Sequence, residues 1–312
     1  MKAFLAALLA TGLLATDAAA DGLPVVNVEV GAEGVTNPSL RHRIVTLPAG
    51  KDTIVARIDR GSGRVRRFRT IRGRYTIPAV AYDGSASGLS ADGRSLALIV
   101  PRPGFPRKRT TFALLDAGTL KPRTTLSLVG DFSFDAMSPN GRWLYLIHYT
   151  SPDDPLRYQV RALDTSSGKL DPKPIVDPRE PDEAMNGHPL TRATSPDGRW
   201  AYTLYEGAKH PFVHALDTSG RSARCIDLDW LHGRKDLWQL RFALNRGGRE
   251  LSVRSGARSV AVVDTQSFRA SPSRADSGGR DWPGLSLVGV GLAALLGAAL
   301  LYLVLMRRRT TP

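Results

Sequence analysis

Length, composition and charge describe a basic, folded protein of moderate size. The chain has 312 residues, of which 42% are hydrophobic, and its formal net charge is +14. This apolar fraction excludes an intrinsically disordered chain, and the single cysteine, Cys225, excludes a disulfide within one molecule. The positive charge favours anionic partners such as lipid head groups or envelope polymers.

The N-terminus has the pattern of a secretory signal. Lys2 is followed by an apolar run and then by small residues up to Ala20. A short positive region, a hydrophobic region and a small-residue site are the three parts of a signal peptide. We therefore predict that residues 1–20 are a signal peptide cleaved after Ala20 and that residues 21–270 form an extracytoplasmic domain. Nucleic acid is not an expected partner in that compartment.

A run of arginines lies near the start of this domain. If it forms a strand, Arg64 and Arg66 share one face, and Arg67 and Arg69 share the other. One interpretation is a patch that binds an anionic ligand, a phosphate or a polymer. The other is a solvated edge strand whose charge prevents aggregation. The candidate patch consists of Arg64, Arg66, Arg67, Arg69, Arg72 and Arg74.

A short string that ends in Gly-Arg recurs through the domain. Asp-Gly or Asn-Gly between two strand-forming runs predicts a hairpin, because glycine accepts the positive φ that the turn requires. Each copy precedes an apolar or aromatic run. The copies are Ser90–Arg94, Ser138–Arg142, Ser195–Arg199 and the weaker Asn245–Arg249.

A second string centres on an aspartate at the end of a predicted strand. Its carboxylate is expected to accept backbone N–H groups from the turn that follows. The copies recur about every 50 residues, a period typical of propeller blades with four strands each. We therefore predict an all-β fold, a β-propeller of five to six four-stranded blades. The aspartates are Asp59, Asp116, Asp164, Asp217 and Asp264.

Five blades follow directly from these repeats. The strand Val25–Val30 could complete the last blade and close the ring, and a sixth, degenerate blade could lie within residues 25–85. The string S-P-D-G-R before an apolar-aromatic strand resembles the WD40-like repeat of bacterial TolB-type propellers. The later L-D-T-x-x-G string resembles YVTN-type surface propellers. The resemblance covers roughly residues 45–270 and implies a scaffold for binding, a partner platform or, occasionally, an enzyme.

No catalytic, cofactor-binding or metal-binding residue is predicted. His210 and His214 are four apart, but on a strand they would lie about 13 Å from each other, too far to share an ion. An acidic cluster is interpreted as a solvated loop rather than a calcium site, because its spacing matches no EF-hand. Its members are Asp177, Glu180, Asp182 and Glu183. The repeat aromatics, interpreted as blade packing, are Trp143, Tyr145, Trp200 and Tyr202.

The C-terminus has the pattern of a membrane anchor. Residues 285–306 carry no charge and are long enough to cross a bilayer as one helix. The arginines that follow favour the cytoplasmic side. We predict a linker at 271–284, a single transmembrane helix at 285–306 and a cytoplasmic tail at 307–312, with the domain outside the cytoplasm.

Three functions remain open at this stage. The preferred one is a non-enzymatic binding or interaction platform at the cell membrane, whose partner is an envelope protein or an anionic polymer. The second is a propeller hydrolase or lactonase with a metal in its central channel, although no set of carboxylates or histidines at matching blade positions is evident. The third is a component of envelope assembly. No cofactor is expected.

Overall fold

The computed structural model describes residues 34–36, 41–182 and 185–273. All of them belong to the first of the two units into which the chain divides, Met1–Ser273. The predicted signal peptide, the strand Val25–Val30, most of the linker and the predicted transmembrane segment lie outside the described residues. Within the described ranges, no helix has the length and apolar character needed to span a membrane.

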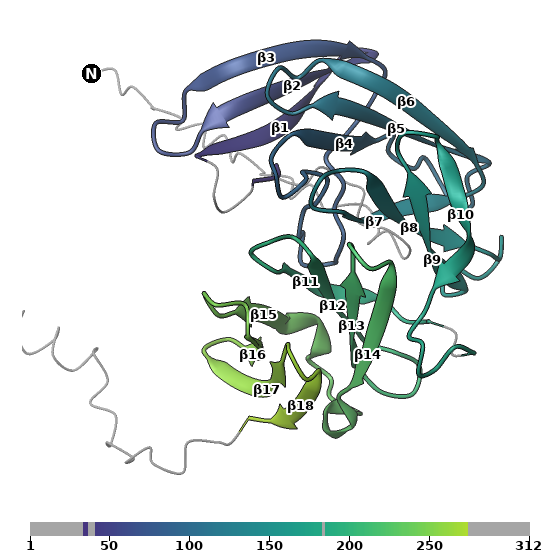
Figure 1. Cartoon of the computed structure of the whole chain (residues 1–312), viewed down its shortest axis with the longest axis vertical. Helices are drawn as coiled ribbons and strands as arrows, with labels where there is room; N and C mark the ends of the chain where they lie inside the picture. Colours follow the sequence, from purple (N-terminus) through teal and green to yellow (C-terminus); the bar gives the residue numbers. More distant parts are fainter. Residues whose placement is uncertain (1–33, 37–40, 183–184, 274–312) are drawn as a thin grey trace, which may run out of the picture. The chain divides into compact units, whose positions relative to one another are not determined.

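The described residues form five antiparallel sheets, each built from strands that are consecutive in the sequence (Figure 1). Sheet 1 contains β1 (His42–Ala49), β2 (Asp52–Asp59) and β3 (Val65–Arg72). Sheet 2 contains β4 (Ser95–Ile99), β5 (Arg109–Asp116) and β6 (Pro122–Val129). Sheet 3 contains β7 (Phe132–Met137), β8 (Trp143–Tyr149), β9 (Tyr158–Asp164) and β10 (Lys169–Ile175).

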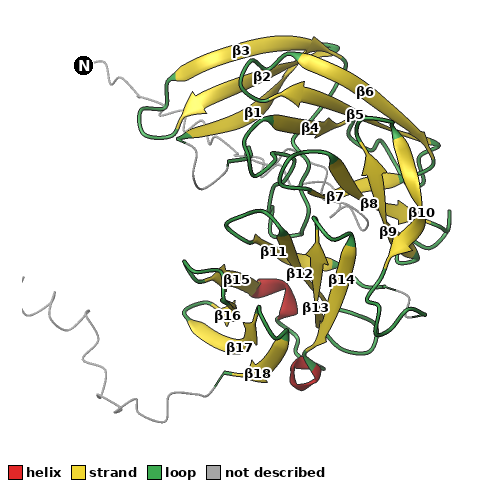
Figure 2. Ribbon diagram, viewed as in Figure 1, coloured by secondary structure: helices red, strands yellow, loops and turns green. Residues whose placement is uncertain are grey.

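The two remaining sheets have four strands each. Sheet 4 contains β11 (Pro189–Thr194), β12 (Trp200–Tyr205), β13 (Phe212–Asp217) and β14 (Ser222–Asp227). Sheet 5 contains β15 (Leu240–Leu244), β16 (Glu250–Ser255), β17 (Arg258–Asp264) and β18 (Arg269–Pro272). The helical residues in the described ranges are two short 3-10 turns, η1 (Asp229–Leu231) and η2 (Leu237–Gln239), which lie between sheets 4 and 5 (Figure 2).

Sheets 1 and 2 each have a remnant of a fourth strand. Val35 bridges to Ile44 on the free edge of β1, and Leu89 bridges to Leu96 on the free edge of β4. The backbone N–H of Val35 donates to the carbonyl of Ile44 at 2.9 Å. All five sheets therefore follow one four-strand plan, in which the innermost strand is shortened in the first two.

Successive sheets pack face to face through four hydrophobic clusters. These clusters join sheets 1 and 2, 2 and 3, 3 and 4, and 4 and 5. On β8, Leu144 and Leu146 belong to the cluster shared with sheet 2, whereas Tyr145 belongs to the cluster shared with sheet 4. The strand is thus buried on both faces, which explains its almost continuous apolar sequence. This packing is that of propeller blades and confirms the predicted all-β propeller.

The five sheets correspond to the five blades that the repeats predicted. Sheet 5 already has four strands, so the strand Val25–Val30 is not required to complete it. The described residues between β3 and β4 form no further sheet. They include instead a small hairpin closed by a bridge between Ala79 and Ala86. None of the four hydrophobic clusters contains residues of both sheet 1 and sheet 5.

The Gly-Arg turns form as predicted and also pack on one another. Gly141 and Gly198 have φ values of +73° and +72°. A Cβ at Gly141 would lie 2.5 Å from the Cβ of Ser95, and a Cβ at Gly198 would lie 2.4 Å from that of Ala91. Glycine is therefore required at both turns for two reasons, the backbone conformation and the close contact with a turn of another sheet.

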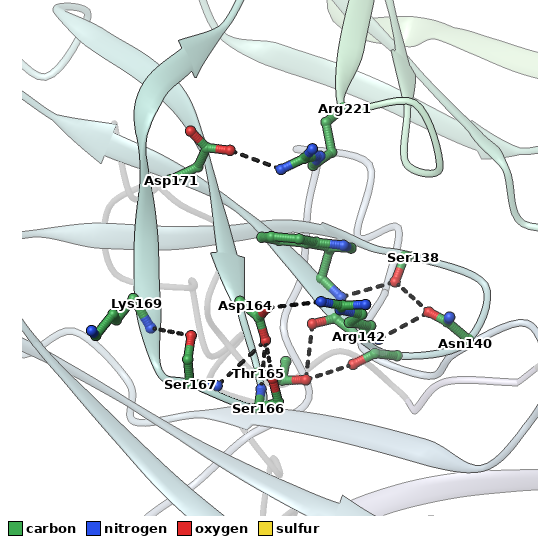
Figure 3. A network of polar contacts seen from close by, with 12 residues as sticks. Ser138, Asn140, Arg142, Asp164, Thr165, Ser166, Ser167, Lys169, Asp171 and Arg221 are labelled. Atoms are coloured by element: carbon green, nitrogen blue, oxygen red, sulfur yellow. Dashed lines mark hydrogen bonds and ion pairs between the residues drawn. The ribbon is translucent and has the colours of Figure 1, made fainter.

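Each turn is also held by its own side chains (Figure 3). The Ser138 hydroxyl accepts the backbone N–H of Trp143 at 2.9 Å and donates to the Asn140 side chain at 3.0 Å. At the same end of the sheet, Asp164 accepts the backbone N–H of Ser166 at 2.8 Å and pairs with Arg142 of the turn at 3.4 Å. All five repeat aspartates accept backbone N–H groups in this way, as the sequence predicted.

The Ala79–Ala86 hairpin connects the start of the domain to sheet 4. The backbone N–H of Tyr82 donates to the carbonyl of Pro189 at 2.9 Å, and that of Asp83 donates to Leu190 at 3.2 Å. The Thr191 hydroxyl donates to the Asp83 carboxylate at 2.5 Å. The hairpin thus contacts a sheet that lies more than 100 residues further along the chain.

Candidate functional site

A cleft of about 870 Å³ lies between sheets 3 and 4. Strands β9, β10, β13 and β14 form its walls, and the loops 150–157, 176–182, 185–186 and 207–210 surround it. Cavities of a few hundred to about 1,000 Å³ are typical of ligand sites, and the junction of two packed elements is a common place for them. The cleft is the candidate functional site of the described part of the chain.

Aromatic side chains form the inner wall of the cleft. Tyr158 and Phe212 are 7% and 9% exposed, and the ring of Tyr205 stacks on Phe212 with centroids 5.3 Å apart. The Tyr158 hydroxyl donates to the carbonyl of Gly187 at 2.8 Å. Burial raises the pKa of Tyr158 well above its usual range, so its hydroxyl stays protonated. The wall therefore offers an apolar, uncharged surface.

His214 extends this wall and has an unsatisfied ring nitrogen. It lies on β13, is 1% exposed, and sits edge-on to Tyr205. Its Nε2 is buried and has no hydrogen-bond partner in the structure. Burial lowers the pKa of His214 to about 4, so the imidazole is neutral at neutral pH. An unpaired buried polar atom costs about 1–3 kcal/mol, a cost that a ligand group bonded to Nε2 would remove.

The mouth of the cleft is acidic, although the chain is basic. Glu180, Asp182 and Asp227 are exposed there, and burial of part of the Asp227 carboxyl raises its pKa. The arginine and lysine among the described lining residues are Arg157 and Lys209. The mouth therefore favours a cationic group over an anion.

Asp177 corrects the prediction that the acidic cluster is a solvated loop. Its side chain is 1% exposed and pairs with Arg179 at 2.5 Å and with Arg224 at 3.0 Å. It also accepts the backbone N–H of Cys225 at 2.9 Å. Burial opposes ionisation, but these hydrogen bonds hold the pKa of Asp177 well below its usual range. Asp177 thus joins the end of β10 to β14, whereas Glu180 and Asp182 are exposed as predicted.

The arginine run lies apart from the cleft. Four of its members are on β3, the outermost strand of sheet 1, and Arg64 and Arg74 lie just before and after it. Arg66 pairs with Asp59 at 2.9 Å. The placement on an exposed edge strand fits both interpretations of the run, and the binding of an anionic ligand stays a prediction. Arg69 is half-buried, and the exposed members are Arg64, Arg66, Arg67, Arg72 and Arg74.

The other candidate residues follow the predictions in part. Tyr145 and Tyr202 are buried in the clusters between blades, as expected of packing residues. Trp143 and Trp200 are half-buried and are covered by arginines, with Arg221 4.7 Å from the Trp143 ring. Among the described residues, no group of three or more histidine, cysteine, aspartate or glutamate side chains is arranged to hold a metal.

Comparison with known proteins adds little to this description. No protein-family model matches the chain, and no curated protein matches it. Similar solved structures include TolB from Acinetobacter baumannii, with 16% identity and a TM-score of 0.40 over 74% of this chain and 51% of that chain. This chain therefore spans about half the length of that protein.

For two other similar structures, the match covers a larger share of the similar chain. A putative TolB from Agrobacterium tumefaciens has 13% identity and a TM-score of 0.43 over 77% of this chain and 78% of that chain. The β-propeller domain of Cps50 (Swd1) from Myceliophteria thermophila has 14% identity and a TM-score of 0.43, over 75% of this chain and 66% of that chain. TolB structures are thus among the similar ones, as the repeat string predicted. The likeness concerns the fold alone, which the five packed sheets already establish.

Proposed function

We propose that the protein is an extracytoplasmic β-propeller, anchored by one C-terminal membrane helix, that acts as a non-enzymatic binding platform. The observation that carries this proposal is the cleft between sheets 3 and 4, where the unpartnered Nε2 of His214 lies on an aromatic wall below an acidic mouth. The predicted signal peptide and anchor supply the location. The partner is an envelope protein.

The chemistry of the cleft defines the segment that it accepts. An apolar side chain would cover Tyr158 and Phe212, and burial of such a side chain is worth about 1.5–3 kcal/mol. A neighbouring lysine or arginine would meet the Asp227 and Glu180 carboxylates. A backbone amide of the same segment would bond to Nε2 of His214. The ligand is therefore a polypeptide segment that carries an apolar residue and a lysine or arginine close to each other.

Site-specific photo-crosslinking in intact membranes tests this binding site. A photoreactive residue replaces Lys209 at the mouth, and in a matched control it replaces Lys121, an exposed lysine of sheet 2. We expect an adduct with one protein from position 209 only. Asp227→Asn with Glu180→Gln should reduce that adduct several-fold, and the crosslinked peptide should contain lysine or arginine.

Equal crosslinking from both positions, or an adduct that the double substitution leaves unchanged, would refute the cleft as the binding site. The topology has a separate test. In a Cys225→Ser background, a membrane-impermeant thiol reagent should label Ser277→Cys in intact spheroplasts, and Thr311→Cys only after lysis. The reverse labelling would refute the proposed orientation without bearing on the cleft.

A further inference from the structure

Most of the net positive charge of the protein is concentrated in and beside sheet 1. Residues 41–74 contain eleven lysines and arginines but only two aspartates, a net charge of +9 out of +14 for the whole chain. Arg64 and Arg72 are exposed, and no acidic side chain among the described residues pairs with either. This charge distribution exceeds what the protection of one edge strand requires.

The same sheet carries exposed apolar side chains. Leu47, Val65 and Phe68 are 51%, 56% and 67% exposed, and they are three of the six large hydrophobic residues exposed in the described part of the chain. Because side chains alternate along a strand and paired residues share a face, the pairing register determines where they lie.

The register places these side chains on the outer face of sheet 1. Phe68 pairs with Ala56, and Leu47 pairs with Ile54, two positions away on β2. The alternate positions of the sheet, among them Val55, belong to the cluster shared with sheet 2. The outer face thus presents these apolar residues together with Arg43 and Arg72, which the register places on the same face, and Arg64 directly precedes β3. None of the four hydrophobic clusters of the described residues covers this face.

We propose that this outer face of sheet 1 docks on the surface of an anionic lipid bilayer. Each basic residue close to such a surface contributes about 1 kcal/mol, and the rings and aliphatic side chains gain further free energy by leaving water. A soluble polyanion would engage the arginines but would leave Phe68 and Leu47 in water. The combination of both residue types therefore selects lipid. The proposal shares only the membrane location with the proposed function and does not involve the cleft.

Fluorescence quenching in proteoliposomes tests the docking with the full-length chain. In a Cys225→Ser background, Phe68→Cys carries an environment-sensitive fluorophore, and Val129→Cys is the matched control. Val129 is 76% exposed and lies on the outermost strand of sheet 2. Lipids with a spin label in the acyl chain should quench the probe at position 68 at least three-fold more in bilayers with phosphatidylglycerol than in phosphatidylcholine alone. The probe at position 129 should be unaffected in both.

Charge reversal identifies the groups responsible. Arg64→Glu with Arg72→Glu should abolish the quenching at position 68, whereas the same change at Arg258 and Arg269 of sheet 5 should leave it intact. Quenching should also fall at 1 M salt, where the Debye length is about 3 Å. Tryptophan fluorescence checks that all variants are folded.

Two outcomes would overturn the proposal. The first is equal quenching at positions 68 and 129, or equal quenching in anionic and neutral bilayers. The second concerns a soluble polyanion. In this outcome polyphosphate binds the wild type, its binding requires Arg64 and Arg72, and the probe at position 68 shows no contact with lipid. The face would then be a polyanion site. The orientation test with thiol reagents would be unaffected by either outcome.

Discussion

His214 makes the stability of the protein depend on pH. Its pKa is about 4 in the folded state, against about 6.5 in an unfolded chain, so between these values the unfolded state binds more protons. Stability therefore falls as the pH falls through this range. Between pH 7.5 and pH 5 the wild type should lose about 2 kcal/mol more of its unfolding free energy than His214→Gln, which cannot titrate.

Chemical denaturation of the detergent-solubilised protein at the two pH values measures this difference. His232, which is exposed, provides the control, because His232→Gln should behave like the wild type. Equal pH dependence of the wild type and His214→Gln would show that the imidazole is solvated, and the case for an unpartnered nitrogen in the cleft would fail.

Asp177 is the second buried residue whose contribution to the unfolding free energy can be measured. Asp177→Asn should reduce the unfolding free energy by about 2–3 kcal/mol, because Arg179, Arg224 and the N–H of Cys225 lose a charged acceptor. Asp182→Asn, an exposed neighbour, should stay within about 0.5 kcal/mol of the wild type. Thermal and denaturant unfolding of the wild type and the two variants measure these differences. A loss for Asp177→Asn as small as that for Asp182→Asn would show that Asp177 belongs to a solvated loop and does not join β10 to β14.

The candidate site was less accessible to prediction than the fold, for reasons visible at single residues. The acidic cluster stands out in the sequence, but the partner of Asp177 on β14, Arg224, is 47 residues away. Phe212 and His214 are alternate residues of β13, whereas Tyr158 begins β9 in another sheet, more than 50 residues earlier in the chain. In the sequence they resemble ordinary strand residues, and only the packing of sheet 3 against sheet 4 brings them to one cleft.

The Gly-Arg turn is the element that the sequence describes best. A hairpin signal and a strand-ending aspartate are local, so four turns and five strand ends could be placed before the structure was known. The contact between turns of different sheets is not local and could not be predicted. Nor could the Ala79–Ala86 hairpin, whose hydrogen bonds reach Pro189 and Leu190.

Substitutions at the turns separate these two contributions. Gly63→Ala introduces a side chain at a φ of +67° in open space and should cost about 1 kcal/mol. Gly141→Ala and Gly198→Ala meet the same backbone strain plus a contact of 2.5 Å or less with another turn. They should cost about 1–3 kcal/mol more than Gly63→Ala, which is the usual cost of overpacking. Equal losses in denaturant unfolding at all three positions would show that the turns do not pack together.

At the scale of the whole molecule, the two units should separate cleanly. The described sheets all lie within Met1–Ser273, so deletion of residues 274–312 should release a folded protein into the soluble fraction at 1 M salt, where the docking of sheet 1 on lipid is screened. Its unfolding midpoint should lie within about 2 °C of that of the same unit in the full-length chain. Cell fractionation and thermal denaturation measure both quantities. A truncated chain that stays in the membrane at 1 M salt would contradict the proposed anchor, and one that is unfolded would contradict the independence of the domain.

The Ala79–Ala86 hairpin has a consequence for how the protein unfolds. An array in which each sheet contacts only its neighbours can lose its sheets one at a time from either end. Here the hydrogen bonds of Tyr82 and Asp83 tie the segment before sheet 2 to sheet 4 and enclose sheet 3 between them. Sheets 2 to 4 are thereby coupled into one cooperative unit, and only the first and last sheets are free to open by themselves.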